Sequence, residues 1–209
     1  TAGTMGWRWI PSAGAAGYKL VSDAGAAIFD NANTAQTAFS SATFLPTALC
    51  GAKIAAYNSQ AGLGPYSASV YAYTLAAAPG ITPGVNGITG VSSTTVSLSW
   101  NPNANTSYTF YEVSLATDSA FGVVAATKDA QGVAAQVSGL FPGATYYARV
   151  RAFNGSRQAT AFVAAGSTCT NADPSVSRAP VPASPYALPA GLAGLWHFDE
   201  SAGAAVHDL

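Results

Sequence analysis

Short segments in which apolar and polar residues alternate recur along the chain, separated by clusters of Gly, Pro, Asn and Ser. Residues 5–9 and 96–100 are two of these segments, and in each the apolar side chains fall on one face of an extended backbone. Such alternation is typical of a half-buried β-strand. No stretch of ten or more residues combines helical periodicity with caps, so we expect an all-β sandwich architecture with negligible helix.

The chain contains an internal repeat. Trp9 aligns with Trp100, Tyr18 aligns with Tyr111, and residues 44–58 align without a gap on residues 140–154. Three matches in the same order predict two tandem copies of one domain. In the last match, alternate positions from Cys50 and from Tyr146 onward are expected to point into the core.

Both copies resemble fibronectin type III domains. The second copy carries Trp100, Tyr111, the run Leu140-Phe-Pro-Gly-Ala-Thr-Tyr146 and then Ala152-Phe-Asn154. The resemblance implies two tandem immunoglobulin-like β-sandwiches, with Tyr146 as the corner tyrosine whose hydroxyl bonds to backbone upstream. The first copy has Cys50 at that position and loses a hydrogen bond worth about 1 kcal/mol, so we expect it to be the less stable copy.

The copies differ at their beginnings. Residues 81–89 precede the Trp100 strand and are expected to form the first strand of the second domain, residues 79–170. The first domain, residues 1–78, has only four residues before Met5, and we expect it to lack that strand. A sandwich without an edge strand exposes unpaired backbone, which is a template for another strand.

The composition changes after residue 170. Residues 171–190 contain five prolines, which predicts an extended linker. Residues 191–209 then resemble the opening of a laminin G-like, or concanavalin A-like, jelly-roll domain, through the run Leu195-Trp-His-Phe-Asp-Glu200. Only the first strand of such a domain is present, and ordering it alone costs roughly 1–2 kcal/mol per residue, so we expect it to pair with a partner.

These two features suggest a mode of assembly. The tail strand of one chain would add to the first domain of a neighbour and give a head-to-tail fibre. The residues expected to take part are Leu192, Leu195, Trp196 and Phe198 in the tail, and Met5 and Trp7 in the first domain. The alternative is that the chain ends are boundaries of a fragment and that the tail packs locally.

Charge and composition narrow the choice of partners. Only 8% of the residues are charged, the net charge is −1, and 8 Lys and Arg offer no basic face for a phosphate backbone. No apolar stretch approaches the roughly 20 residues of a membrane-spanning helix.

Residues 1–10 show no secretory signal, so we expect that it was removed or that the chain is an internal fragment. Cys50 and Cys169 fall in different domains and are expected to be free thiols.

Residues that could carry chemistry are few. His197 and Asp199 share one face of the tail strand, which permits a metal site, but a solvated strand edge is the favoured interpretation. No nucleophile elbow, zinc-binding helix or phosphate loop occurs, so we expect no catalytic residue, no cofactor and no metal. The aromatic residues that could stack on sugars or peptides are expected to lie in the core instead; they are Trp7, Tyr66, Tyr71, Tyr73, Tyr108 and Phe121. Asn105 and Asn154 begin glycosylation sequons on predicted loops.

Two classes of function remain open. The first is a non-catalytic structural or adhesive segment of a secreted or cell-surface protein, for which the Ala-rich composition suggests a bacterial source. It would associate with other copies through the exposed sheet edge, with carbohydrate contact an open question. The second is a spacer or accessory region of a secreted carbohydrate-active enzyme.

Overall fold

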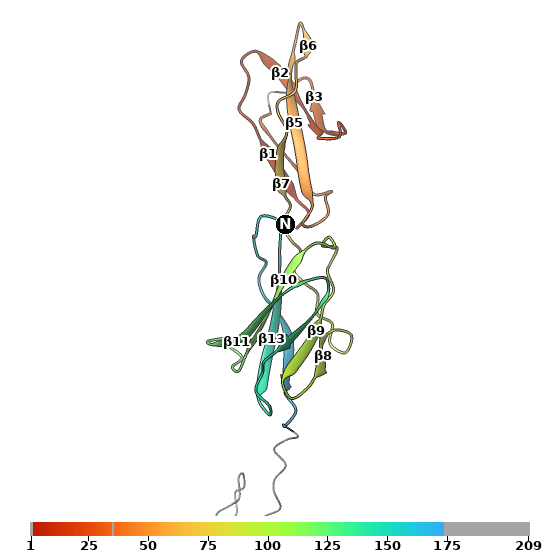
Figure 1. Cartoon of the computed structure of the whole chain (residues 1–209). Coiled ribbons are helices and arrows are strands. Elements are labelled where there is room, and N and C mark those ends of the chain that lie inside the picture. The colour runs from red at the N-terminus through yellow and green to blue at the C-terminus, as the bar shows by residue number, and fades with distance from the viewer. Residues whose placement is uncertain (1, 35, 174–209) are drawn as a thin grey trace, which may run out of the picture. The chain divides into compact units, whose positions relative to one another are not determined.

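The computed structural model describes residues 2–34 and 36–173. This part of the chain contains fourteen β-strands and no helix, and so none that could cross a membrane. The strands form two successive β-sandwiches, as predicted (Figure 1). Of the linker and tail expected over residues 171–209, residues 174–209 lie outside the described residues.

The first sandwich is built from a two-stranded and a larger antiparallel sheet. The small sheet pairs β1 with β4, and the larger has the order β3-β2-β5, with β6 and β7 both pairing with β5. The last strand of the sheet is therefore split in two pieces. The strands are β1 (Met5–Arg8), β2 (Ala15–Ser22), β3 (Ala27–Asn31), β4 (Ala38–Ser41), β5 (Leu49–Asn58), β6 (Gly62–Leu63) and β7 (Val70–Tyr73).

The second sandwich has one strand more in its smaller sheet. That sheet has the order β12-β9-β8, and the facing sheet has the order β11-β10-β13-β14. Figure 1 shows β8 and β9 together on one side of β10 and β13. The strands are β8 (Gly87–Val91), β9 (Thr95–Ser99), β10 (Phe110–Ala116), β11 (Val124–Gln131), β12 (Ala134–Ser138), β13 (Thr145–Phe153) and β14 (Val163–Cys169).

The first strand of the second sandwich begins later than predicted. We expected it over residues 81–89, but β8 begins at Gly87. The preceding residues form a turn instead, in which the N–H of Thr82 donates to the side chain of Asn86 and Gly84 has a φ of 80°. Such a φ suits glycine, and a turn there ends the extended backbone. Ile81 still packs against the core.

The predicted inward positions are confirmed most clearly in the second sandwich. Val96, Leu98 and Trp100 are at most 3% exposed, and Tyr111 is equally buried. The alternate residues of β13 from Tyr146 to Ala152 are also buried. In the first sandwich Tyr18, Cys50 and Ala52 are buried, whereas Ile54 and Ala56 are half-buried. Both cysteines are free thiols, as expected.

The corner tyrosine is confirmed. The hydroxyl of Tyr146 accepts a hydrogen bond of 3.0 Å from the N–H of Phe141, which lies upstream. Thr170 adds a second restraint on the same turn, because its hydroxyl accepts from the N–H of Ala144 and donates to the carbonyl of Phe141. Two side chains therefore fix this corner.

The first sandwich keeps only the second of these restraints. Cys50 replaces the tyrosine, and its thiol lies 3.8 Å from the carbonyl oxygen of Ala48. Thr74 occupies the position equivalent to Thr170, accepts from the N–H of Ala48 and donates to the carbonyl of Leu45. The repeated threonine, which the sequence comparison did not single out, pins the same turn in both copies.

The two sequon asparagines are internal. Asn105 is 8% exposed, accepts from the N–H of Ala77 and donates to the carbonyl of the same residue. Asn154 is 2% exposed and accepts from the N–H groups of Ser156 and Gln158. Each amide therefore stabilises a loop, and neither is presented on the surface as a glycan acceptor would be.

Candidate functional site

The outer edge of β1 is unpaired within residues 2–34 and 36–173. β1 has β4 on one side only, whereas the equivalent β9 lies between β12 and β8. The N–H of Trp9 donates to Thr37 with 3.1 Å between nitrogen and oxygen, and the equivalent N–H of Trp100 donates to Val133 at 2.9 Å. Because hydrogen-bonding direction alternates along an antiparallel strand, Gly6 and Arg8 direct their backbone groups away from β4, toward the open edge.

The aromatic side chains behind this edge are incompletely covered. Trp7 contacts Phe39 with 6.2 Å between ring centroids and Phe44 with 5.6 Å, and Phe39 contacts Phe29 at 5.0 Å. Trp9 continues the row by contacting Phe29 at 6.1 Å. All five rings are half-buried, although Met5 is 8% exposed.

The second sandwich shows what covers the equivalent positions when a first strand is present. There Ile88 on β8 and Ile81 in the segment before β8 pack against the core. Leu98, the equivalent of Trp7, is 1% exposed, and Trp100, the equivalent of Trp9, is 3% exposed. Among the described residues, the first sandwich has the same core positions without this cover. Of the residues predicted for assembly, Met5 and Trp7 therefore lie on the inner face of the open strand β1.

The tail residues predicted to take part in assembly are Leu192, Leu195, Trp196 and Phe198. All four lie outside the described residues, as do His197 and Asp199. Their part in assembly stays a prediction. Among the residues that the structure describes, no group of three or more His, Cys, Asp or Glu side chains is placed to hold a metal ion.

A second surface lies on the outward face of the larger sheet of the first sandwich. Tyr71 is 55% exposed and Tyr66 is 38% exposed, so the expectation that they lie in the core is wrong. Both lie on or near the edge formed by the split last strand, where alternation does not distinguish inner from outer face. Tyr108, in the second sandwich, is also exposed, whereas Trp7, Tyr73 and Phe121 are half-buried.

Carboxylates hold two tyrosines of this surface. Asp23 accepts hydrogen bonds from the hydroxyls of Ser69 and Tyr71, and these bonds lower the pKa of its carboxyl group. Asp30 is bonded to the ammonium of Lys19 and to the hydroxyl of Tyr57, which together lower its pKa. The same bonds raise the pKa of Tyr71 and of Tyr57.

We predict a measurable pH dependence for the Asp23 contact. The folded state holds the pKa of Asp23 below its ordinary value, so the contribution to stability is present above that ordinary value and is lost as the pH falls through the folded pKa. Tyr71→Phe should therefore raise the pKa of Asp23. Carboxyl carbon chemical shifts followed by NMR from pH 7 to pH 2 check this, and an unchanged titration in the variant would contradict the assignment.

The outward face of the second sandwich carries alternating aromatic and arginine side chains. The guanidinium of Arg149 lies 3.9 Å from the ring centroids of both Phe121 and Phe162. The guanidinium of Arg151 lies 4.4 Å from Phe162 and 5.0 Å from Phe153. Cation–π contacts of this kind stabilise exposed sheet faces. Phe121 is therefore engaged within the domain and is not free for a ligand, and the two arginines had no signal in the sequence pattern.

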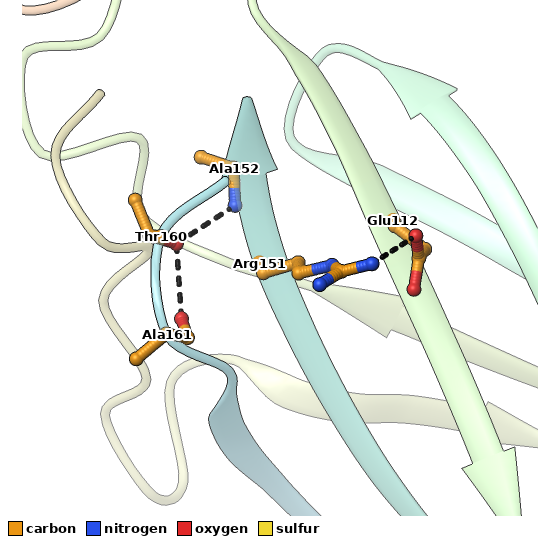
Figure 2. Close-up of polar contacts among 5 residues, drawn as sticks. All are labelled: Glu112, Arg151, Ala152, Thr160 and Ala161. Atoms are coloured by element: carbon orange, nitrogen blue, oxygen red, sulfur yellow. Dashed lines mark hydrogen bonds and ion pairs between the residues drawn. The ribbon is translucent and has the colours of Figure 1, made fainter. Parts of the chain in front are cut away.

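Arg151 also makes an ion pair across two strands. Its Nη2 lies 2.9 Å from Oε2 of Glu112, which lies on β10 (Figure 2). Figure 2 also shows the Thr160 hydroxyl, which accepts from the N–H of Ala152 at 3.1 Å and donates to the carbonyl of Ala161 at 2.9 Å. These contacts secure the end of β13 and give this face a structural role.

Comparison with known proteins agrees with the fold. Residues 79–163 match the family model for the fibronectin type III domain. No curated protein matches the chain significantly. A solved two-domain fibronectin type III segment from chicken tenascin is 15% identical, covers 81% of this chain and 94% of its own, and has a TM-score of 0.51.

Two other solved structures are less similar. The FN1–FN3 domains of chicken CNTN1 are 19% identical, with 81% of this chain and 63% of that chain covered and a TM-score of 0.36. The fibronectin type III domain of human fibronectin type III domain containing protein 3 is 17% identical. The match covers 50% of this chain and 94% of that chain, with a TM-score of 0.38. The family match to the second sandwich and the tenascin likeness across both identify the fold as tandem fibronectin type III β-sandwiches.

Proposed function

We propose that this chain is a non-catalytic structural or adhesive segment of a secreted or cell-surface protein and that its first sandwich accepts a β-strand from another copy. Fibronectin type III domains are typically non-catalytic modules and occur mainly in extracellular or cell-surface proteins. The observation that carries the strand-acceptor proposal is the unpaired edge of β1 with half-buried aromatic rings behind it.

The donor is the tail segment from Leu192 to Phe198. Its sequence places Trp196 and Phe198 at alternate positions, so one face of an extended strand would be aromatic. The occupant of the β1 edge must supply large apolar groups, because Ile81 and Ile88 do so for the second sandwich. Strand addition gives main-chain hydrogen bonds for affinity and alternate side chains for specificity.

Repeated donation would form an open chain. Donor and acceptor are different segments of the chain, and a head-to-tail contact of this kind continues until it closes into a ring or extends as a filament. Negative-stain electron microscopy of the 209-residue chain should show filaments. Trp196→Asp combined with Phe198→Asp should abolish them, whereas the matched control His197→Asp, which changes the opposite face, should not.

The acceptor is tested at single residues. Hydrogen exchange at the amides of Gly6 and Arg8 should be slow in the assembled chain and at least tenfold faster in the tail variant, whereas the amide of Trp9, bonded to Thr37, should change little. Gly6→Pro removes one N–H from the open edge and should block assembly. Filaments that persist in the tail variant would overturn the proposal. So would slow exchange at Gly6 in a monomer of a longer chain, because residues before Thr1 would then occupy the edge.

A further inference from the structure

The outward face of the larger sheet in the first sandwich carries a row of three tyrosines. Gly51, Lys53, Ala55 and Tyr57 alternate along β5 with the inward residues, so they share this face. Tyr71 on β7 pairs with Gly51 and therefore begins the row, which ends at Tyr57. Tyr57 lies six positions after Gly51 along β5, so the row extends for about 20 Å.

The ring of Tyr71 lies directly on the sheet. A Cβ atom at Gly51 would be 2.5 Å from Cε1 and 2.8 Å from Cδ1 of Tyr71, so only glycine permits this position. The hydroxyl of Tyr71 donates to Asp23 with 2.7 Å between the oxygens, which fixes the far end of the ring. One ring face is thus against the backbone, and the side chain is still 55% exposed.

Tyr66 is positioned by the loop that replaces the middle of the last strand. The N–H of Gly64 donates to Ala56 at 2.9 Å, and the N–H of Ser67 donates to Ile54 at 2.8 Å. The loop therefore runs beside β5 and places Tyr66 between the other two tyrosines. The ammonium of Lys53 lies 5.7 Å from its ring centroid, and the residue is 38% exposed.

The charges along the row balance. Lys19 and Asp30 form an ion pair of 2.7 Å, and Asp30 also accepts from the hydroxyl of Tyr57 at 2.7 Å. Asp23 and Lys53 supply one further charge of each sign. The surface therefore has no net attraction for an anion, but it presents carboxylate, phenol and ammonium groups that are already fixed in place.

We infer that this row, Tyr57, Tyr66 and Tyr71, is a binding surface for a neutral polysaccharide. A sugar ring has an apolar face that stacks on an exposed aromatic ring and a rim of hydroxyls that bond to fixed polar groups. A linear and charge-balanced row about 20 Å long fits several units of such a polymer. A peptide would instead require pockets for individual side chains, and on this face the ring of Tyr71 lies against the sheet at Gly51.

The test uses the 209-residue chain and four neutral polysaccharides, namely cellulose, chitin, xylan and β-1,3-glucan. The chain should sediment with at least one of them. Tyr66→Ala combined with Tyr71→Ala should weaken that binding at least tenfold. Tyr108→Ala removes a tyrosine of the second sandwich that is as exposed as Tyr71, and it should leave the binding unchanged. Circular dichroism of each variant reports whether the fold is intact.

A second variant tests whether binding depends on the position of the Tyr71 ring against the sheet as well as on its presence. Gly51→Ala keeps Tyr71 but displaces it from the sheet, and it should weaken binding at least threefold. Binding should persist in Gly6→Pro, because the row does not depend on strand donation. Sedimentation with none of the four polysaccharides, or equal binding by the double tyrosine variant, would overturn the inference.

Discussion

Replacing Trp100 by alanine should destabilise the second sandwich by about 3–5 kcal/mol, which is typical of a large aromatic residue removed from a closed core. Trp100 is 3% exposed and contacts Tyr111 with 5.1 Å between ring centroids. The strands on both sides of β9 prevent the core from collapsing into the space that the indole leaves. Urea unfolding followed by circular dichroism should show the loss in the transition of the second sandwich.

The equivalent change in the first sandwich should cost less. Trp9 makes the matching contact with Tyr18 at 5.5 Å, but its side chain is half-buried, so Trp9→Ala should cost no more than about 2 kcal/mol. Neither indole N–H has an acceptor among the described residues, so burial is the main difference between the two sites. Equal losses for both variants would show that the first core is already closed.

Gly17→Ala should destabilise the first sandwich by about 3 kcal/mol or more, because the added methyl group meets backbone that cannot move aside. A Cβ atom at Gly17 would lie 2.5 Å from the carbonyl carbon of Ala32 and closer still to the carbonyl oxygen of Asn31. Gly17 is buried where the register of β2 against β5 shifts. Thermal unfolding measured by calorimetry should show a lower midpoint for the first sandwich alone.

Gly6→Ala is the matched control. Gly6 lies on β1 in the smaller sheet of the same sandwich, and nothing is within 4 Å of the position that its Cβ would take. The change should alter stability by no more than about 0.5 kcal/mol. A comparable loss at Gly6 and Gly17 would mean that glycine flexibility, and not close approach of the backbone, determines the effect.

The strand faces were predictable wherever a second sheet covers the predicted side. Val96, Leu98 and Trp100 alternate in sequence and are all buried, because β9 lies in the middle of its sheet. The corner of Tyr146 was equally predictable, since a local turn and one hydroxyl determine it. These features depend on short-range spacing, which the sequence displays directly.

Tyr66 and Tyr71 were not predictable in the same way. Their segment was expected to lie in the core, but the last strand of the first sandwich is split into β6 and β7, and the loop between them faces outward. Pro83 and Gly84 likewise form a turn where a strand was expected. In both places, whether the segment forms a strand or a loop depends on which neighbouring strand accepts its backbone hydrogen bonds. The alternation of apolar and polar residues carries no information on that pairing.

The sequence alone determined that the chain folds as two copies of one β-sandwich, because the same motifs occur in the same order in both copies. The tertiary structure decided that Gly6 and Arg8 face the open edge and that three tyrosines lie in a row beside two fixed carboxylates. Those relations join residues as far as 48 positions apart. The pairing of β1 with β4 determines the open edge, and the pairing of β2, β5 and β7 brings the tyrosines and carboxylates together.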